Sequence, residues 1–106
     1  MDETEFEALA ERALERVEAA LEASGIDADV ERKEGGVLEI EFADGSKMIV
    51  NRHGAAREIW VAARAGGFHF RWDGAQWRDT RAGDELFAAL SRLVSAQSGQ
   101  PVLLRP

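Results

Sequence analysis

The first quarter of the chain has apolar residues at every third or fourth position between Thr4 and Ser24. This spacing places the apolar side chains on one stripe of a helix and the polar ones on the opposite side. The stripe consists of Phe6, Leu9, Ala10, Ala13, Leu14, Val17, Ala20 and Leu21. Thr4 and Glu7 fit a capping box at the start, and Ser24 followed by Gly25 is a typical helix end. The pattern therefore predicts an amphipathic helix over residues 4–24.

Beyond Gly25 the pattern changes to short stretches in which apolar and polar residues alternate. Glycine-containing turn sequences separate these stretches, at residues 34–36, 43–45, 53–54, 65–67 and 73–74. Alternation is typical of strands that have one buried face and one wet face. We expect strands at residues 28–33, 37–43, 46–52, 57–63, 68–73 and 76–79. Because the connections are too short for crossover helices, the sheet should be an antiparallel meander.

A second amphipathic pattern, at residues 84–97, predicts a closing helix capped by Asp84 or Gly83. The apolar tail at residues 101–104 is expected to fold back over the edge of the core. Two helices that each need cover, together with a sheet with one apolar face, indicate an α+β fold. The expected architecture is a two-layer α-β-α sandwich, with both terminal helices on one face of an antiparallel sheet of about six strands. At 106 residues, without a linker or repeat, the chain is expected to form a single domain over residues 1–106.

Composition narrows the classes of function. The chain contains no cysteine, which excludes disulfides, thiolate nucleophiles, zinc–thiolate sites and an iron–sulfur cluster held by cysteine. No stretch approaches the roughly 18 apolar residues of a membrane span, and the acidic start is unlike a signal or transit peptide. By elimination we expect a cytoplasmic protein that does not bind a membrane.

Charge is distributed unevenly along the chain, whose formal net charge is -7. Residues 1–44 contain 15 of the 20 acidic residues but only 4 of the 13 basic ones, so this segment carries -11 and the remainder +4. Such asymmetry disfavours nucleic acid as a partner of the N-terminal half. It favours cations or a basic protein surface instead.

The acidic residues of the predicted first helix form a ridge. Five glutamates fall within a band of about 80° on a helix that turns 100° per residue: Glu7, Glu11, Glu15, Glu18 and Glu22. Arg12 and Arg16 project to one side of this band and neutralise it only in part. Asp27, Asp29 and Glu31 extend the acidic run onto the adjoining turn and first strand. The ridge is either a solvated helix face or a functional surface.

Carboxylates are hard ligands suited to divalent and trivalent cations that keep most of their water. A tight iron or zinc site would normally add histidine or cysteine, and only His53 and His69 are present, both far from the ridge in the sequence. Any metal binding should therefore be weak, multiple and exposed. A basic partner protein would also be attracted to this ridge.

Trp60 is a second candidate, because alternation places it on the wet face with Glu58 and Ala62. It is either an interface anchor or an aromatic packed on a neighbouring strand, unless the register is shifted by one residue. Asn51, Arg52 and His53 are either turn residues or a polar patch beside Trp60. Trp72 and Trp77 fit the core or its rim. The sequence has no nucleophile elbow, no glycine-rich phosphate loop before a helix and no paired histidines, so we expect no enzyme.

Several motifs occur in a fixed order: Gly35–Phe42, Asp44–Lys47, Ile49–Arg52, Ile59–Ala62 and Gly66–Phe70, followed by Trp77 and the closing helix. Over nearly the whole chain this series resembles the frataxin family, specifically its bacterial branch, CyaY. The resemblance implies a sandwich that binds iron weakly through surface acids. It also implies docking on the cysteine desulfurase of iron–sulfur cluster assembly, as iron donor, regulator or both.

By position, the resemblance assigns metal-binding roles to one set of acids and partner-binding roles to an overlapping set. The metal set is Glu11, Glu15, Glu18, Glu22, Asp27, Asp29 and Glu31. The partner set is Glu15, Glu18 and Glu22 for the desulfurase, with Asn51 and Trp60 facing the scaffold protein or a neighbouring surface. Two departures from the family are a sparser acidic turn at residues 23–27 and His53 in place of the usual glutamine. His53 could add an imidazole ligand.

The leading hypothesis is an iron-binding adaptor and regulator of cluster assembly, monomeric without iron. The alternative is an iron storage or detoxification protein that oligomerises with iron and has weak ferroxidase-like activity. A third is an acidic decoy for a basic protein unrelated to iron. The sequence leaves open whether assembly is activated or inhibited, which oxidation state of iron is bound, and in what stoichiometry.

Overall fold

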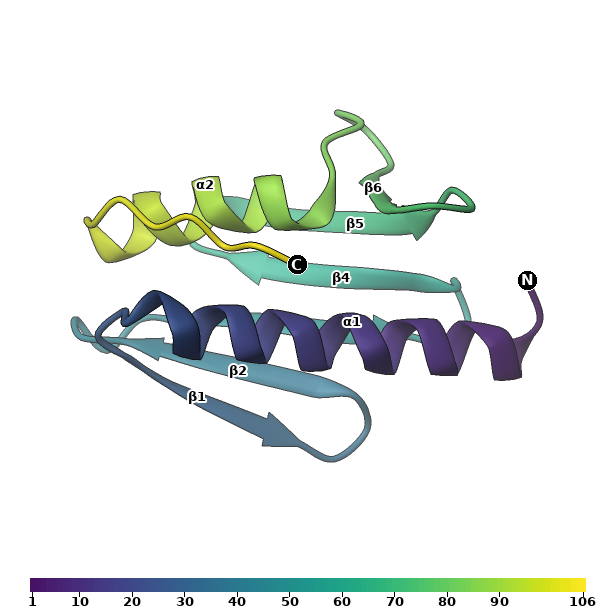
Figure 1. The fold of residues 1–106 in the computed structure, drawn as a ribbon, viewed down its shortest axis with the longest axis horizontal. Helices are drawn as coiled ribbons and strands as arrows, with labels where there is room; N and C mark the ends of the chain where they lie inside the picture. The colour runs from purple at the N-terminus through teal and green to yellow at the C-terminus, as the bar shows by residue number, and fades with distance from the viewer.

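A computed structural model describes all 106 residues. Two helices lie on one face of a six-stranded antiparallel sheet (Figure 1). The elements in chain order are α1 (Glu3–Ser24), β1 (Ala28–Lys33), β2 (Val37–Phe42), β3 (Lys47–His53), β4 (Glu58–Ala63), β5 (Gly66–Trp72), β6 (Trp77–Asp79) and α2 (Leu86–Ser98). Each strand pairs with the next, in the order β1 to β6. The α+β sandwich and its meander are therefore confirmed, with bounds within two residues of those predicted.

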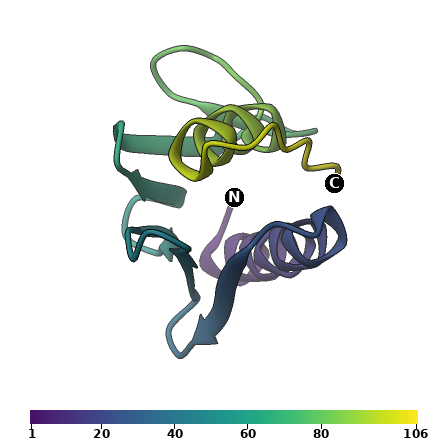
Figure 2. The ribbon, with the colours of Figure 1, turned by 90° about the vertical axis from the view of Figure 1, so that its left-hand side faces the viewer.

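The two layers enclose one apolar core of 23 buried residues, drawn from α1, α2, the sheet and the tail. Seen end-on, α1 and α2 lie side by side on the concave face of the sheet (Figure 2). The strands contribute their inward-facing residues by strict alternation, as in β2, where Leu38 and Ile40 are fully buried and Glu41 is exposed. Alternation thus determines which side chains face the helices and which face solvent.

Helix α1 begins differently from the prediction. Its cap is Asp2, whose Oδ1 accepts a hydrogen bond from the Glu5 N–H at 2.8 Å. The capping box of Thr4 and Glu7 is therefore wrong, because Thr4 already lies inside the helix. The end is as predicted: Gly25 adopts φ 71°, and its N–H donates to the Glu22 carbonyl.

Helix α2 is capped by Glu85 rather than by Asp84 or Gly83. The Glu85 carboxylate accepts hydrogen bonds from Phe87 N at 2.8 Å and Ala88 N at 3.2 Å. Glu85 is held extended by a bridge to Arg78 of β6, which places its side chain over the open N–H groups. Asp84 instead pairs with Arg92 at 3.2 Å.

The C-terminal tail runs back along α2, as predicted (Figure 1). Two serines of α2 hold it, because Ser95 Oγ accepts from Val102 N and Ser91 Oγ accepts from Leu104 N, both at 2.9 Å. Leu104 is thereby buried in the core. None of the helices has the length and apolarity needed to cross a membrane.

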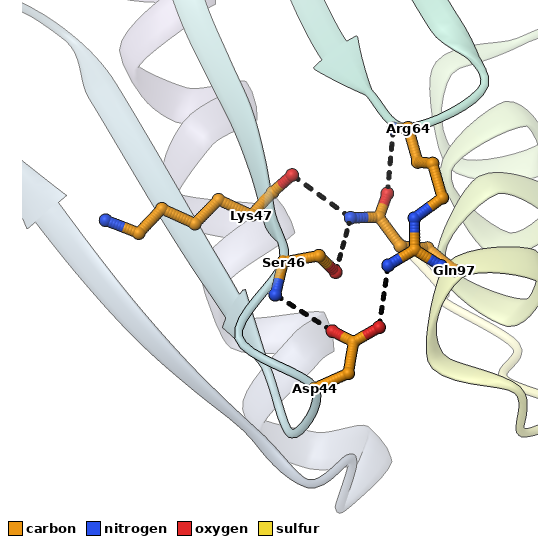
Figure 3. A network of polar contacts seen from close by, with 5 residues as sticks. All are labelled: Asp44, Ser46, Lys47, Arg64 and Gln97. Atoms are coloured by element: carbon orange, nitrogen blue, oxygen red, sulfur yellow. Dashed lines mark hydrogen bonds and ion pairs between the residues drawn. The ribbon is translucent and has the colours of Figure 1, made fainter.

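A polar network joins two turns of the sheet to the end of α2 (Figure 3). The buried Gln97 amide accepts from Arg64 N at 3.0 Å and donates to Ser46 Oγ at 3.0 Å and to the Lys47 carbonyl at 3.1 Å. Asp44 accepts from Ser46 N and from the Arg64 guanidinium at 2.6 Å. Hydrogen bonds from Ser46, and then from Arg64, hold the pKa of Asp44 well below its usual range.

Candidate functional site

The acids of α1 fall into two groups according to their neighbours. Glu11 and Glu18 are half-buried and lean toward β1, where Arg32 Nη2 lies 2.5 Å from Glu11 Oε1 and Arg32 Nη1 lies 3.8 Å from Glu18 Oε1. Arg52 of β3 adds a second contact to Glu11, at 3.7 Å. Glu15 and Glu22 are exposed and have no ion-pair partner. Two of the five glutamates of the predicted ridge therefore have a basic neighbour within the fold.

Arg32 reaches α1 because alternation along β1 turns it to the inner face, with Ala28 and Val30. Its Nε is buried without a hydrogen-bond partner, so its favourable contacts come from the terminal nitrogens alone. A cation placed between Glu11 and Glu18 would have to displace this guanidinium. Of the acids predicted to bind metal, these two are the least accessible.

Asp29 and Glu31 point the other way, onto the outer face of the sheet. In the β1–β2 register Asp29 lies opposite Glu41, and Glu31 lies opposite Glu39. Glu39 and Glu41 were not among the predicted site residues, although alternation with hairpin pairing would have placed them beside the β1 acids. The acids of β1 thus lie on the outer face of the sheet, whereas those of α1 lie on the helix that covers its inner face.

Two lysines compensate only one of these four carboxylates. Lys33 and Lys47 both bond Glu39, at 2.8 and 3.1 Å. The hydrogen bond from Lys33, followed by that from Lys47, lowers the pKa of Glu39. Asp29, Glu31 and Glu41 have no cationic partner, so the outer edge keeps a net negative charge.

Asp27 lies on the turn from α1 to β1, between the acids of the helix and those of the strand. With Asp29 and Glu41 it lines a shallow hollow of about 230 Å³ where β1 begins and β2 ends. No group of three or more Asp, Glu or His side chains is positioned to hold one metal ion together. The acids form a dispersed edge that can attract cations, rather than a preformed chelate.

Trp60 lies on the outer face of β4, as the predicted register requires, directly opposite Asn51 of β3. It is also packed on both neighbouring strands. The His53 ring of β3 stacks on the indole with ring centroids 3.7 Å apart and an interplanar angle of 11°. The His69 ring of β5 stacks on it with centroids 4.4 Å apart and an angle of 9°. The indole is therefore stacked on imidazoles from both neighbouring strands and remains partly exposed.

Glu58 holds the Trp60 indole in place through a hydrogen bond. It is 5 % exposed, and its Oε1 accepts from Trp60 Nε1 at 2.9 Å while its Oε2 accepts from Arg71 Nη2 at 2.6 Å. Burial raises the pKa of Glu58, but the hydrogen bonds from Trp60 and Arg71 outweigh it, so the pKa is lowered overall. In the sequence, the signal for this contact was the two-residue spacing of Glu58 and Trp60, which places both side chains on one face of a strand.

The remaining polar residues of this face divide between two sites. His53 Nδ1 accepts from Ala56 N at 3.2 Å, and its ring lies across the indole from His69, so the two imidazoles cannot ligate one ion. Arg52 faces the opposite side, toward Glu11. The suggested patch of Asn51, Arg52 and His53 is therefore wrong for Arg52, because alternation turns it inward.

The geometry defines a small α+β protein with an acidic helix and an aromatic sheet face. Comparison with known proteins shows the family to which it belongs. A frataxin-like domain family matches residues 1–100. A CyaY iron–sulfur cluster assembly protein of Dechloromonas aromatica is 67% identical over 105 residues, covering 99% of this chain and all of that one. Another, of Cupriavidus metallidurans, is 55% identical, covering 99% and 97%. The chain belongs to the frataxin family, in its bacterial branch, CyaY.

Solved structures agree with this assignment. Frataxin from Psychromonas ingrahamii, studied as a CyaY family member, superposes with a TM-score of 0.90 at 31% identity over the full length of both chains. Trimeric frataxin from the yeast Saccharomyces cerevisiae, in a complex described as ferrous, gives 0.67 at 22% identity, covering 94% of this chain and 88% of that one. At that identity the likeness concerns the fold alone.

Proposed function

We propose that this protein is an adaptor and regulator of iron–sulfur cluster assembly that docks on a cysteine desulfurase through the acids of α1. The support comes from the relatives named as cluster assembly proteins and from the segregation of charge. The observation that carries the proposal is that Glu15 and Glu22 are exposed without a counter-ion, whereas Glu11 and Glu18 face Arg32. The first pair is available to a basic surface of the desulfurase at no cost in internal ion pairs.

Glu18 belongs to the docking surface at its margin. Its carboxylate is half-buried and lies 3.8 Å from Arg32, so it contributes less to a partner than Glu15 or Glu22. Asn51 and the exposed edge of Trp60 form a second contact, for the scaffold protein of cluster assembly or a surface beside it. The two contacts lie on different faces, which allows one molecule to touch two partners.

Iron enters the proposal as cargo rather than as a resident cofactor. The exposed acids Glu15, Glu22, Asp27, Asp29 and Glu31 supply hard oxygen ligands one at a time, with water completing the shell. Glu11 and Glu18 join only when Arg32 is displaced. Binding of this kind is weak, releases iron readily and suits delivery to a partner.

Charge reversal tests the docking surface. Glu15→Lys with Glu22→Lys should lower the affinity for the desulfurase by about tenfold or more at low salt. The matched control is Glu34→Lys with Glu41→Lys, which makes the same charge change at two exposed acids away from α1 that have no ion-pair partner. Equal affinity of the two double variants would contradict the proposal.

Sedimentation velocity with ferrous iron in air separates the proposal from iron storage. An adaptor stays monomeric with a few bound ions, whereas a store with ferroxidase-like activity grows into large iron-loaded assemblies. A ferrous titration that left the amide signals of α1 and β1 unchanged would instead favour the acidic decoy. Each result selects one of the three hypotheses.

A further inference from the structure

A hollow of about 260 Å³ lies on the flank of α1 that faces away from β1. It is bounded by α1, by the turn from β5 to β6, by the start of α2 and by Pro106 of the C-terminal tail. Two arginines of α1, Arg12 and Arg16, line it together with two tryptophans, Trp72 and Trp77. Neither the acidic edge nor the Trp60 face includes any of these four residues.

The two arginines bring positive charge to the hollow and are not held in ion pairs. Arg12 and Arg16 are one helical turn apart, both are exposed, and neither makes an ion pair or a hydrogen bond. Like charges at this spacing destabilise a helix by a few tenths of a kcal/mol. Glu85 also lines the hollow, but its carboxylate is occupied by the first N–H groups of α2.

The walls of the hollow are aromatic and apolar. Trp72 is half-buried and Trp77 is buried, with their rings 5.6 Å apart at 62°. Leu9 and Phe87 add apolar surface. Small-molecule sites are typically concave and apolar, with a few polar groups that fix the orientation of the ligand. An apolar hollow beside paired guanidinium groups has this composition.

We propose that this hollow binds a small anion with a planar apolar body, that is, an aromatic ring carrying a carboxylate or a phosphate. The ring would pack against Trp72, while Arg12 and Arg16 bind the anionic oxygens, since guanidinium groups match carboxylate and phosphate geometry. An acidic protein repels free anions at long range, so the apolar contact is what makes this ligand class selective. The inference does not depend on the proposed role in cluster assembly.

A pair of probes with one aromatic framework tests the charge requirement. The first is 8-anilinonaphthalene-1-sulfonate, and the second is its uncharged counterpart N-phenyl-1-naphthylamine. We expect the sulfonate to bind about tenfold more tightly by fluorescence titration, and to shift the indole N–H signals of Trp72 and Trp77 more than that of Trp60. Equal affinity for the two probes, or shifts confined to Trp60, would overturn the inference.

Arginine variants separate this site from general attraction. Arg12→Gln with Arg16→Gln should weaken binding of the sulfonate about tenfold and leave the uncharged probe unaffected. The control, Arg81→Gln with Lys47→Gln, removes the same charge from exposed positions elsewhere and should change neither. Both double variants replace exposed side chains, and circular dichroism checks that they fold. A control that weakens binding as much as the test variant would contradict a specific site.

Competition distinguishes the ligand chemistries. We expect 2-naphthoate and phenyl phosphate to displace the sulfonate probe, and their ratio shows whether carboxylate or phosphate is preferred. Inorganic phosphate at the same concentration should displace little, because it lacks the ring. Displacement by inorganic phosphate as effective as by phenyl phosphate would show that the hollow is only a cationic surface.

Discussion

Arg32 Nη2 of β1 lies 2.5 Å from Glu11 Oε1 of α1. Through this contact, and a longer one to Glu18, a basic residue of the sheet partly neutralises the acidic face of the helix. The pairs are partly exposed, and such ion pairs typically contribute less than about 1 kcal/mol each. They also divide the helix acids by accessibility, because Glu15 and Glu22 remain exposed without a basic neighbour.

Replacing Arg32 should enlarge the acidic site. Arg32→Gln releases Glu11 and Glu18, so we expect more bound ferrous ions at saturation and a free energy of unfolding lower by about 1 kcal/mol. Iron titration and urea unfolding measure the two effects. Arg81→Gln is the matched control, because it removes the same charge at an exposed position that makes no ion pair with the acids of the site. Unchanged iron stoichiometry in Arg32→Gln would contradict the shielding role.

Removing the histidine clamp should expose Trp60. In His53→Ala with His69→Ala the indole loses stacking on both faces, and each stack contributes about 0.5–1.5 kcal/mol beyond the burial of area. We expect Trp60 emission to shift to the red, recorded with Trp72 and Trp77 replaced by phenylalanine in both proteins. Phenylalanine at both histidine positions should restore the stacking and reverse most of the shift. An emission spectrum insensitive to alanine would mean that Trp60 is not clamped in solution.

Glu58 should make stability depend on pH. Its pKa is lowered in the fold from the usual 4.5, so its contribution is present above pH 4.5 and is lost as pH falls through the folded pKa. Glu58→Gln leaves Trp60 or Arg71 without its acceptor and should cost about 2 kcal/mol at pH 7. Urea unfolding at pH 7 and pH 3 should show this difference shrinking at the lower pH. A difference that grows at pH 3 would refute the assignment.

The Gln97 network predicts a large effect from a residue far from any proposed contact. Gln97→Ala leaves Arg64 N and the Lys47 carbonyl without their buried partner and should lower the free energy of unfolding by about 2–3 kcal/mol. Gln100→Ala, at an exposed position just beyond the helix, is the control. Denaturant unfolding of the two variants compares them. Equal stabilities would mean that water replaces the Gln97 amide without loss.

Periodicity alone predicted the elements, because burying one face of a helix or strand imposes spacings of 3.6 and 2.0 on the sequence. The capping residues were predicted wrongly. Asp2 and Thr4 are both acceptable caps for α1, and Glu85 caps α2 only because its bridge to β6 holds it extended. Local sequence contains the choices, whereas tertiary contacts select among them.

The candidate site was predicted as a set of acids but not as a geometry. Helical spacing alone put Glu11, Glu15, Glu18 and Glu22 on one ridge, yet their division depends on Arg32 reaching across from β1. The stacking of His69 on Trp60 depends on the β4–β5 register, which pairs these two residues directly. The spacing of residues along the chain could not predict these contacts, because they join segments that are distant in the sequence.

We propose that the exposed acids of α1 and its turn form one surface for both iron and the desulfurase. An amide NMR titration with ferrous iron, followed by the desulfurase, measures both footprints on one set of residues. Both additions should perturb Glu15, Glu22 and Asp27, with smaller changes at Glu11 and Glu18. Footprints confined to the Trp60 face or the Arg12 flank, with α1 acids undisturbed, would contradict it.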